Sequence, residues 1–355
     1  MKIAIIGLQN SGKTTIFNAL TRSAAEVADY SNAKAEPNLA VVNVEDERVV
    51  RLSAMYKPRK TVYATVEFID FAGVARHSDK GGFPPELVQA ARITDALAVV
   101  VRNFHNDLMG EPTPGADLES IEDEMILSDL IIVETRLERI AQDNKKGKKT
   151  PQVQVEEEAL RAIRDTLNEG LPIRDMNLAP EAEKALRGFQ FLTRKPLMVI
   201  VNSDDGRFGK NASLLAELEA NYRTIEFAGN FEMELSRLTE EEDIRLFMED
   251  MGITESARSL LTRNAYELLG YISFFTVGPD EVRAWNLKKG QSAVEAAGVI
   301  HSDLARGFIR AECFSCADLF ACGSEKAVKE KGLLRLEGKD YPVNDGDILC
   351  IRFNV

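Results

Sequence analysis

The feature that most constrains the fold is a glycine-rich stretch near the amino terminus, Gly7-Leu-Gln-Asn-Ser-Gly-Lys-Thr14, which fits the pattern G-x-x-x-x-G-K-[ST]. It directly follows the apolar run Ile3–Ile6, which predicts a buried strand, and it opens a predicted helix over Thr15–Leu20. Backbone N–H groups of such a loop and the N-terminus of the helix both attract phosphate oxygens. The sequence therefore predicts an α/β fold with a nucleotide site at this turn.

The polar residues of this stretch have distinct expected roles. Lys13 is expected to reach the β- and γ-phosphates, and Thr14 to offer its hydroxyl to Mg²⁺. The other expected phosphate-binding residues of the stretch are small or have amide side chains: Gly7, Asn10, Ser11, Gly12 and Thr15. An incidental lysine in a strand–helix turn is the simpler alternative, but the flanking strand and helix argue against it.

A second ligand for Mg²⁺ is expected at the end of a neighbouring strand. The run Thr65–Ile69 ends at Asp70, which begins a D-x-x-G sequence that closes at Gly73. In this arrangement the aspartate anchors Mg²⁺ and the glycine amide senses the γ-phosphate. We therefore assign Thr14 and Asp70 to the metal, and Gly73, with Lys13, to catalysis. In GTPases of the Ras type a glutamine orients water at the next position, but Val74 has no polar group for this task.

A third motif, Asn202-Ser-Asp-Asp205, comes directly after the apolar run Leu197–Val201. GTPases place N-K-x-D here for base recognition, and the carboxylate of Asp205 could accept two donors from guanine. Ser203 replaces the lysine that packs on the base, which weakens the prediction of GTP preference. A polar turn after a strand is the alternative interpretation.

The rest of the chain predicts three parts. Apolar runs at 62–69 and 96–101 predict further parallel strands, and the prolines within 111–115 mark a linker. Two helices of an antiparallel coiled coil are predicted from apolar residues spaced four and three apart, namely Ile126, Leu130, Val133, Leu137 and Ile140 on the first and Leu160, Ile163 and Leu167 on the second. The expected domains are 1–113 with 194–270, 114–193 inserted between them, and 271–355.

Composition narrows the class of protein. Hydrophobic residues make up 45% of the chain, and no apolar run approaches the roughly 18 residues of a membrane helix. The net charge of −13 opposes binding to nucleic acid as a whole, so we expect no membrane and no DNA partner, and only a local contact with RNA. Four cysteines between Cys313 and Cys350 form no disulfide framework, and the cytoplasm is the expected location. A monomer is favoured.

Several runs after residue 270 are specific enough to indicate a family: Gly270–Trp285, Ala296–Asp303, Gly307–Glu312, Leu336–Tyr341, Asp345–Asp347 and Arg352–Val355. Together with the three motifs they resemble the YchF-type Obg-like ATPase family over nearly the whole chain. The resemblance implies an α/β fold class with a P-loop G domain of mostly parallel sheet, an inserted α-helical coiled-coil hairpin and a C-terminal β-grasp (TGS) domain. It also implies purine-triphosphate hydrolysis and association with the ribosome, through its large subunit or rRNA, in translation or stress.

The resemblance carries over to individual residues. Asn10 matches the asparagine that helps ligate K⁺ in potassium-dependent relatives, which assigns it to catalysis as well as to binding. Asn202 and Asp205 match the base motif, where the usual glutamate of the family is associated with tolerance of ATP. The family leans to ATP and the chemistry of Asp205 leans to GTP, so the base stays open.

Two departures from the family bear on catalysis. Lys34 stands where the family has a threonine that contacts Mg²⁺, and a cation cannot ligate the metal. Lys34 could reach the γ-phosphate instead, but a solvated loop lysine is the favoured interpretation. The stretch 106–111 has no histidine where the family carries one proposed for catalysis. His105 is offset from that position and receives no role.

Two weaker signals have competing interpretations. Cys313 and Cys316 form a C-x-x-C that could bind zinc or act in redox chemistry, although small buried side chains are the simpler interpretation. The predicted hairpin tip carries four lysines, Lys145, Lys146, Lys148 and Lys149, which form either a solvated turn or a local contact with RNA.

The sequence as a whole predicts a slow Mg²⁺-dependent hydrolase of GTP or ATP, with a possible K⁺ requirement, that acts as a ribosome-associated switch. A nucleotide-binding scaffold or RNA-binding adaptor with little hydrolysis is the main alternative, since Val74 and Lys34 depart from the catalytic pattern. A P-loop kinase is disfavoured, because D-x-x-G together with N-x-x-D is typical of switches.

Overall fold

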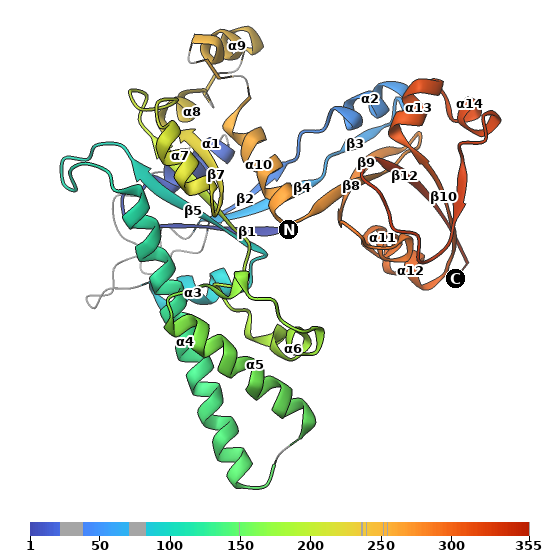
Figure 1. Cartoon of the computed structure of the whole chain (residues 1–355). Helices are drawn as coiled ribbons and strands as arrows, with labels where there is room; N and C mark the ends of the chain where they lie inside the picture. The colour runs from blue at the N-terminus through green and yellow to red at the C-terminus, as the bar shows by residue number, and fades with distance from the viewer. Residues whose placement is uncertain are drawn as a thin grey trace. The chain divides into compact units, whose positions relative to one another are not determined.

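The apolar runs read from the sequence form the centre of a six-stranded sheet with the order β2-β4-β1-β5-β6-β7 (Figure 1). Its strands are β1 (Lys2–Gly7), β2 (Asn38–Asn43), β4 (Thr65–Asp70), β5 (Ala96–Asn103), β6 (Leu197–Ser203) and β7 (Arg223–Ala228). The computed structural model describes residues 1–21, 38–70, 83–148, 150–235, 237–238, 240–250, 252–253 and 255–354.

The pairings of β1 with β4 and β5, of β5 with β6, and of β6 with β7 are all parallel. Every residue of β5 and β6 is buried, as expected for central strands of a parallel sheet. Parallel strands bring their carboxyl ends to one edge, so the end of β4 and the loops that follow β1, β5 and β6 gather there. The accompanying helices are α1 (Lys13–Thr21), α3 (Pro85–Arg92), α7 (Ala212–Glu219), α8 (Gly229–Leu235) and α9 (Glu241–Asp250).

The predicted coiled coil forms as α4 (Pro114–Lys145) and α5 (Pro151–Asn168), which run side by side in green in Figure 1. The predicted seam is confirmed: Ile126, Val133, Ile140, Leu160, Ile163 and Leu167 share one buried core, with Leu130 and Leu137 packed against it. Thr150 caps α5 by accepting a hydrogen bond from the Val153 N–H, so the chain reverses at the lysine-rich tip. The short elements η1 (Ile173–Asp175), α6 (Pro180–Leu186) and η2 (Arg187–Phe189) follow.

A buried ion pair anchors the hairpin to the sheet. Asp129 of α4 is fully buried and accepts hydrogen bonds from Arg92 of α3 at 2.7 Å and from the backbone N–H groups of Leu192 and Thr193 at 3.1 and 2.8 Å. The Thr193 hydroxyl adds a fourth bond at 2.8 Å. Removing one partner of a buried pair typically costs about 3–5 kcal/mol, so this network fixes the base of the hairpin.

A second six-stranded sheet has the order β11-β10-β12-β8-β9-β3 and mixes parallel and antiparallel pairs. Its strands are β3 (Lys60–Val62), β8 (Tyr271–Thr276), β9 (Glu281–Lys288), β10 (Phe308–Ser315), β11 (Arg335–Glu337) and β12 (Asp347–Phe353). The helices of this part are α2 (Glu47–Tyr56), α10 (Ala257–Leu268), α11 (Ala293–Ile300), α12 (Ser302–Arg306), α13 (Cys316–Cys322) and α14 (Glu325–Glu330). The expected combination of a mostly parallel P-loop domain, a helical hairpin and a β-grasp domain is confirmed.

The limits of the compact units differ from the sequence-based boundaries at several places. The chain forms two compact units, Met1–Ala40 with Glu67–Ala257 and Val41–Val66 with Arg258–Val355. The run 62–69 was expected to form one strand of the first sheet, and this is wrong at its start, because β3 pairs with β9 while only β4 joins β1. Apolar patterning marks residues as extended but does not say which strand they pair with.

Side-chain contacts explain why residues 41–66 belong to the second unit. Arg48 donates to Asp345 at 2.7 Å, the Tyr56 hydroxyl donates to Glu325 at 2.6 Å, and the Arg51 guanidinium lies 3.8 Å from the centre of the Phe320 ring. Each contact joins residues more than 250 positions apart in the sequence. No local pattern signals such pairs.

Among the described residues, none of the helices combines the length and the apolar character that crossing a bilayer requires.

Candidate nucleotide-binding site

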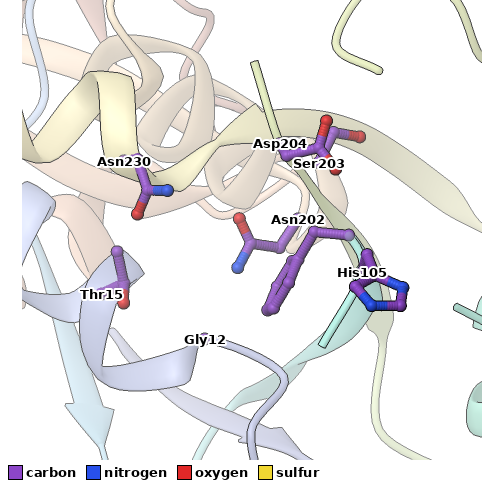
Figure 2. Close-up of a pocket in the computed structure, with 8 residues that line it drawn as sticks. Gly12, Thr15, His105, Asn202, Ser203, Asp204 and Asn230 are labelled. Carbon is purple, nitrogen blue, oxygen red and sulfur yellow. The ribbon is translucent and has the colours of Figure 1, made fainter. Parts of the chain in front are cut away.

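A pocket of about 210 Å³ lies at the carboxyl edge of the first sheet (Figure 2). The loop after β1, the ends of β5 and β6 and the start of α8 contribute to it. The residues that line it are Gly12, Thr15, Phe104, His105, Asn202, Ser203, Asp204 and Asn230. Gly12, Thr15 and Asn202 were expected at a nucleotide site from the sequence, and the fold brings them together from segments nearly 190 residues apart.

The glycine loop has the backbone geometry that a phosphate cradle needs. Gly12 has a φ of +88°, and a Cβ there would lie 2.0 Å from Nδ2 of Asn202. A Cβ at Gly7 would lie 2.5 Å from the Val100 carbonyl oxygen. Asn10 also adopts a positive φ, of 61°. Only glycine fits at Gly7 and Gly12, because the backbone approaches neighbouring atoms too closely for any side chain.

Lys13 is buried at the start of α1, with 8% of its surface exposed. Its Nζ donates hydrogen bonds to the carbonyl oxygens of Gly7 at 2.9 Å and Leu8 at 2.7 Å. Burial lowers the pKa of Lys13 to about 8, and the nearby negative charge of Asp70 opposes that shift. The ammonium is thus held over the loop, where phosphate oxygens would complete its coordination.

The donors assigned to Mg²⁺ fit a hard cation. Asp70 ends β4 with 1% of its surface exposed and pairs in register with Ile5 of β1, so its carboxylate lies at the same sheet edge as the glycine loop. Thr14 follows Lys13 in the first turn of α1. At nucleotide sites Mg²⁺ takes most of its ligands from phosphate oxygens and water, and a carboxylate and a hydroxyl are typical of the few that the protein supplies. Gly73, Val74 and Lys34 lie outside the described residues.

Asn202 joins three parts of the site. Its Nδ2 donates to the Ser11 carbonyl oxygen at 3.0 Å, and its Oδ1 accepts from the Gly229 N–H at 3.3 Å. Figure 2 shows its amide at the centre of the pocket, between Gly12 and the start of α8. The residue therefore ties the glycine loop to the loop after β7, and its role in the structure is to fix the pocket.

Ser203, which stands where a lysine was expected to pack on the base, has a structural role. Its hydroxyl donates to Oε1 of Glu226 at 2.6 Å and accepts from Nδ2 of Asn103 at 2.9 Å. Glu226 in turn accepts from the side chain of Asn211 and from the Gly209 N–H. The hydroxyl thus takes part in the hydrogen bonds that hold the loop after β6.

The two aspartates of the base motif lie in different environments. Asp204 lines the pocket, and its Oδ1 accepts from the Arg207 N–H at 2.9 Å. Asp205, the expected base-recognition residue, is exposed and is not among the lining residues. The structure therefore brings Asp204 rather than Asp205 to the pocket.

Five lining residues were not among the predicted site residues: Ser203 and Asp204 within the base motif, and Phe104, His105 and Asn230 outside any motif. Phe104 and His105 follow β5, and Asn230 follows the end of β7. Figure 2 shows Asn230 and Thr15 together on one side of Asn202, and His105 on the other. The carboxyl-edge rule for parallel sheets would have indicated these positions, because each lies within two residues of the end of a strand of the first sheet.

The cysteine pair that could have bound zinc does not lie in a metal site among the described residues. Cys313 and Cys316 are buried free thiols, and burial raises their pKa values to about 11 and about 12, which disfavours the thiolates that zinc and redox chemistry require. Within the described part of the chain, no cluster of three or more histidine, cysteine or carboxylate side chains could hold a metal. Lys145, Lys146 and Lys148 are exposed at the hairpin tip, and Lys149 lies outside the described residues.

A strand, a glycine loop with a buried lysine, and a carboxylate at the end of the adjacent strand define a P-loop nucleotide-binding protein of the GTPase class. Family comparisons agree. The model described as "50S ribosome-binding GTPase" matches residues 2–143, and the model YchF-GTPase_C, described as "Protein of unknown function (DUF933)", matches residues 271–354.

Relatives match along the whole chain. The "Ribosome-binding ATPase YchF" of Bacillus subtilis is 38% identical over 363 residues, covering 99% of this chain and 98% of the relative. The protein of the same description from Escherichia coli O157:H7 is 36% identical, covering 100% and 99%. The solved structure of the Schizosaccharomyces pombe YchF GTPase superposes with a TM-score of 0.86 at 30% identity, covering 99% of this chain and 97% of that one. The chain belongs to the YchF family.

Proposed function

We propose that this protein binds and slowly hydrolyses a purine nucleoside triphosphate, GTP or ATP, with Mg²⁺, and acts as a ribosome-associated regulatory switch in the cytoplasm. The observation that carries the proposal is the geometry around Lys13, whose buried ammonium lies over the glycine loop beside the carboxylate of Asp70. Relatives with matching full-length sequences are described as ribosome-binding ATPases, which supports both the hydrolysis and the partner.

The proposed roles follow from charge. Lys13 and the N–H groups of the glycine loop stabilise the negative charge of the phosphates. Mg²⁺, when bound by Thr14 and Asp70 beside the phosphates, neutralises charge that develops on their oxygens. Gly73 would report the γ-phosphate through its amide, and Asn10 would assist a K⁺ ion, as in potassium-dependent relatives. Val74 offers no polar group to water, which supports slow hydrolysis by the protein alone.

Phosphate release tests the hydrolase. Multiple turnover is expected with Mg²⁺, and Lys13→Ala should reduce it by about 100-fold or more, since one charge-stabilising group is commonly worth that much. Assays with and without K⁺ and ribosomes measure the contribution of each. Turnover at background under every condition, with nucleotide still bound, would replace the hydrolase by a nucleotide-binding scaffold.

The base is tested by competition between GTP and ATP on the purified protein. Curated relatives are described as ATPases, and Asp205 is exposed and does not line the pocket, so ATP is expected to bind at least as tightly as GTP. A clear preference for GTP would assign guanine recognition to the lining residues Asp204 and Asn230 instead.

We propose that the hairpin tip is the part of the protein that contacts the ribosome, through a local contact with rRNA. Lys145, Lys146 and Lys148 are exposed there in a chain of net charge −13, and short-range phosphate contacts need such a local excess of cations. Changing all three to glutamate should abolish cosedimentation with ribosomes and leave hydrolysis by the isolated protein unchanged.

A matched control has the same change of charge on another surface. Lys326, Lys329 and Lys331 are also exposed, and their change to glutamate should leave cosedimentation intact. Undiminished cosedimentation of the tip variant would refute the contact. Equal losses in both variants would show that net charge, not the tip, governs the association.

A further inference from the structure

Two loops that line the pocket are joined by an ion pair. The first loop follows β5 and carries Phe104 and His105, and the second follows β6 and carries Asp204. Between them, Nη2 of Arg207 donates to Oε2 of Glu111 at 2.6 Å. The base motif and the glycine loop include neither of these two residues.

The first loop is itself held rigidly. Arg102, with 3% of its surface exposed, donates from its guanidinium to the carbonyl oxygens of Phe104 at 2.7 Å, Gly110 at 2.8 Å and Glu111 at 3.1 Å. A backbone bridge between Asn106 and Gly110 closes the loop. These bonds link Glu111 to Phe104 within one loop, so a displacement of Glu111 is expected to displace Phe104 at the pocket wall.

The second loop is linked to the same ion pair. The N–H of Arg207 donates to Oδ1 of Asp204 at 2.9 Å, and its Nε lies 3.5 Å from Oδ2. Glu111 meets His105 of the first loop through its other carboxylate oxygen, at 3.1 Å. One carboxylate thus touches both loops, and these contacts with Arg207 and His105 lower the pKa of Glu111, so it stays ionised at neutral pH.

We propose that Arg207 and Glu111 are positioning residues for nucleotide binding, and that their ion pair clamps the loop bearing Phe104 and His105 to the loop bearing Asp204. The clamp keeps the nucleotide-lining groups at a fixed separation. The side chain of Glu111 is 70% exposed and that of Arg207 is 35% exposed, so solvent screens the pair and it contributes little to the stability of the fold. Its effect falls on the width of the pocket, where small displacements weaken binding. This inference rests on the proposed nucleotide binding.

A double-mutant cycle tests the clamp with Arg207→Gln, Glu111→Gln and the double variant. Each single variant is expected to raise the Kd of a fluorescent purine triphosphate about three- to fivefold, through faster dissociation. The double variant should lose no more than either single variant. The kcat at saturating nucleotide should change by less than about twofold. Arg207→Lys keeps the charge and should restore part of the affinity, because one ammonium can pair with Glu111 but cannot also reach Asp204 as the guanidinium does.

Two controls separate the possible outcomes. Arg245→Gln removes a comparable exposed arginine that pairs with Glu242 and Glu249 on α9, and it should leave Kd unchanged. Unchanged Kd in Arg207→Gln, or additive losses in the double variant, would overturn the clamp while the proposed function stands. If the unmodified protein does not bind nucleotide saturably, or if it binds no more tightly than Lys13→Ala, both the clamp and the proposed function fail.

Discussion

The candidate nucleotide site has one end proposed for the phosphates and one proposed for the base, and the two are built in different ways. At the phosphate end, the glycine loop is a continuous run of sequence whose own backbone makes the cradle, and Lys13 bonds to carbonyl oxygens only five and six residues away. At the base end, the wall is assembled from loops after β5, β6 and β7, and side chains such as Arg102, Arg207 and Asn202 hold it together.

This difference between backbone and side-chain construction indicates where substitutions are tolerated. A cradle made of backbone has no spare room, since a Cβ at Gly12 would lie 2.0 Å from Asn202. A wall made of side chains is held by contacts that can be lost one at a time, such as the hydrogen bonds of Ser203 with Glu226 and Asn103. Effects of mutation should therefore be large at the phosphate end and graded at the base end.

The largest expected effect is at the phosphate end. Gly12→Ala should weaken nucleotide binding by about 100-fold or more, because the new methyl group must displace Asn202 and the backbone has a positive φ. Titration with a fluorescent nucleotide measures the loss. The matched control is Gly170→Ala, where φ is +75° but no atom lies within 4 Å of the added Cβ. Binding that survives in Gly12→Ala as it does in Gly170→Ala would show that the close approach is unimportant.

An intermediate effect is expected from pH, again at the phosphate end. Under the proposed function the protonated form of Lys13 binds phosphate, and burial lowers the pKa of Lys13 to about 8. Bound phosphate raises this pKa, so binding takes up a proton above pH 8, and affinity should fall by up to about tenfold per pH unit there.

The Kd of an adenine nucleotide is measured from about pH 7 to about pH 9.5, because the adenine base has no group that titrates in this range. A flat profile would contradict the lowered pKa of Lys13. Variants at the base end, such as Asp204→Ala, should keep the same slope, because Lys13 is unchanged in them.

The smallest expected effect distinguishes the two aspartates at the base end. Asp204→Ala should raise the Kd for nucleotide about three- to tenfold, because a polar group that lines the pocket is lost. Asp205→Ala should change this Kd by less than about twofold, because Asp205 is exposed and does not line the pocket. Competition between ATP and GTP on both variants shows which aspartate affects base choice. A larger effect at Asp205 would restore the interpretation drawn from the motif.

Much of the fold could be predicted because its signals are local. The apolar runs that became β1, β5 and β6 and the heptad spacing of the hairpin each express a period that neighbouring residues share. The start of the run 62–69 was misassigned because β3 pairs with β9, more than 200 residues further on. Among the site residues, Asn202 was found through its motif, but Phe104 and Asn230 were not, since neither belongs to one.

By itself the sequence determined the phosphate cradle, because a glycine loop between a strand and a helix folds by backbone geometry that nearby residues impose. Only the tertiary structure decided which aspartate faces the pocket, which loops share the Arg207–Glu111 ion pair, and that residues 41–66 join the second unit. Those outcomes depend on side chains that meet only after the strands have paired. Such contacts between distant residues leave no periodic trace along the chain.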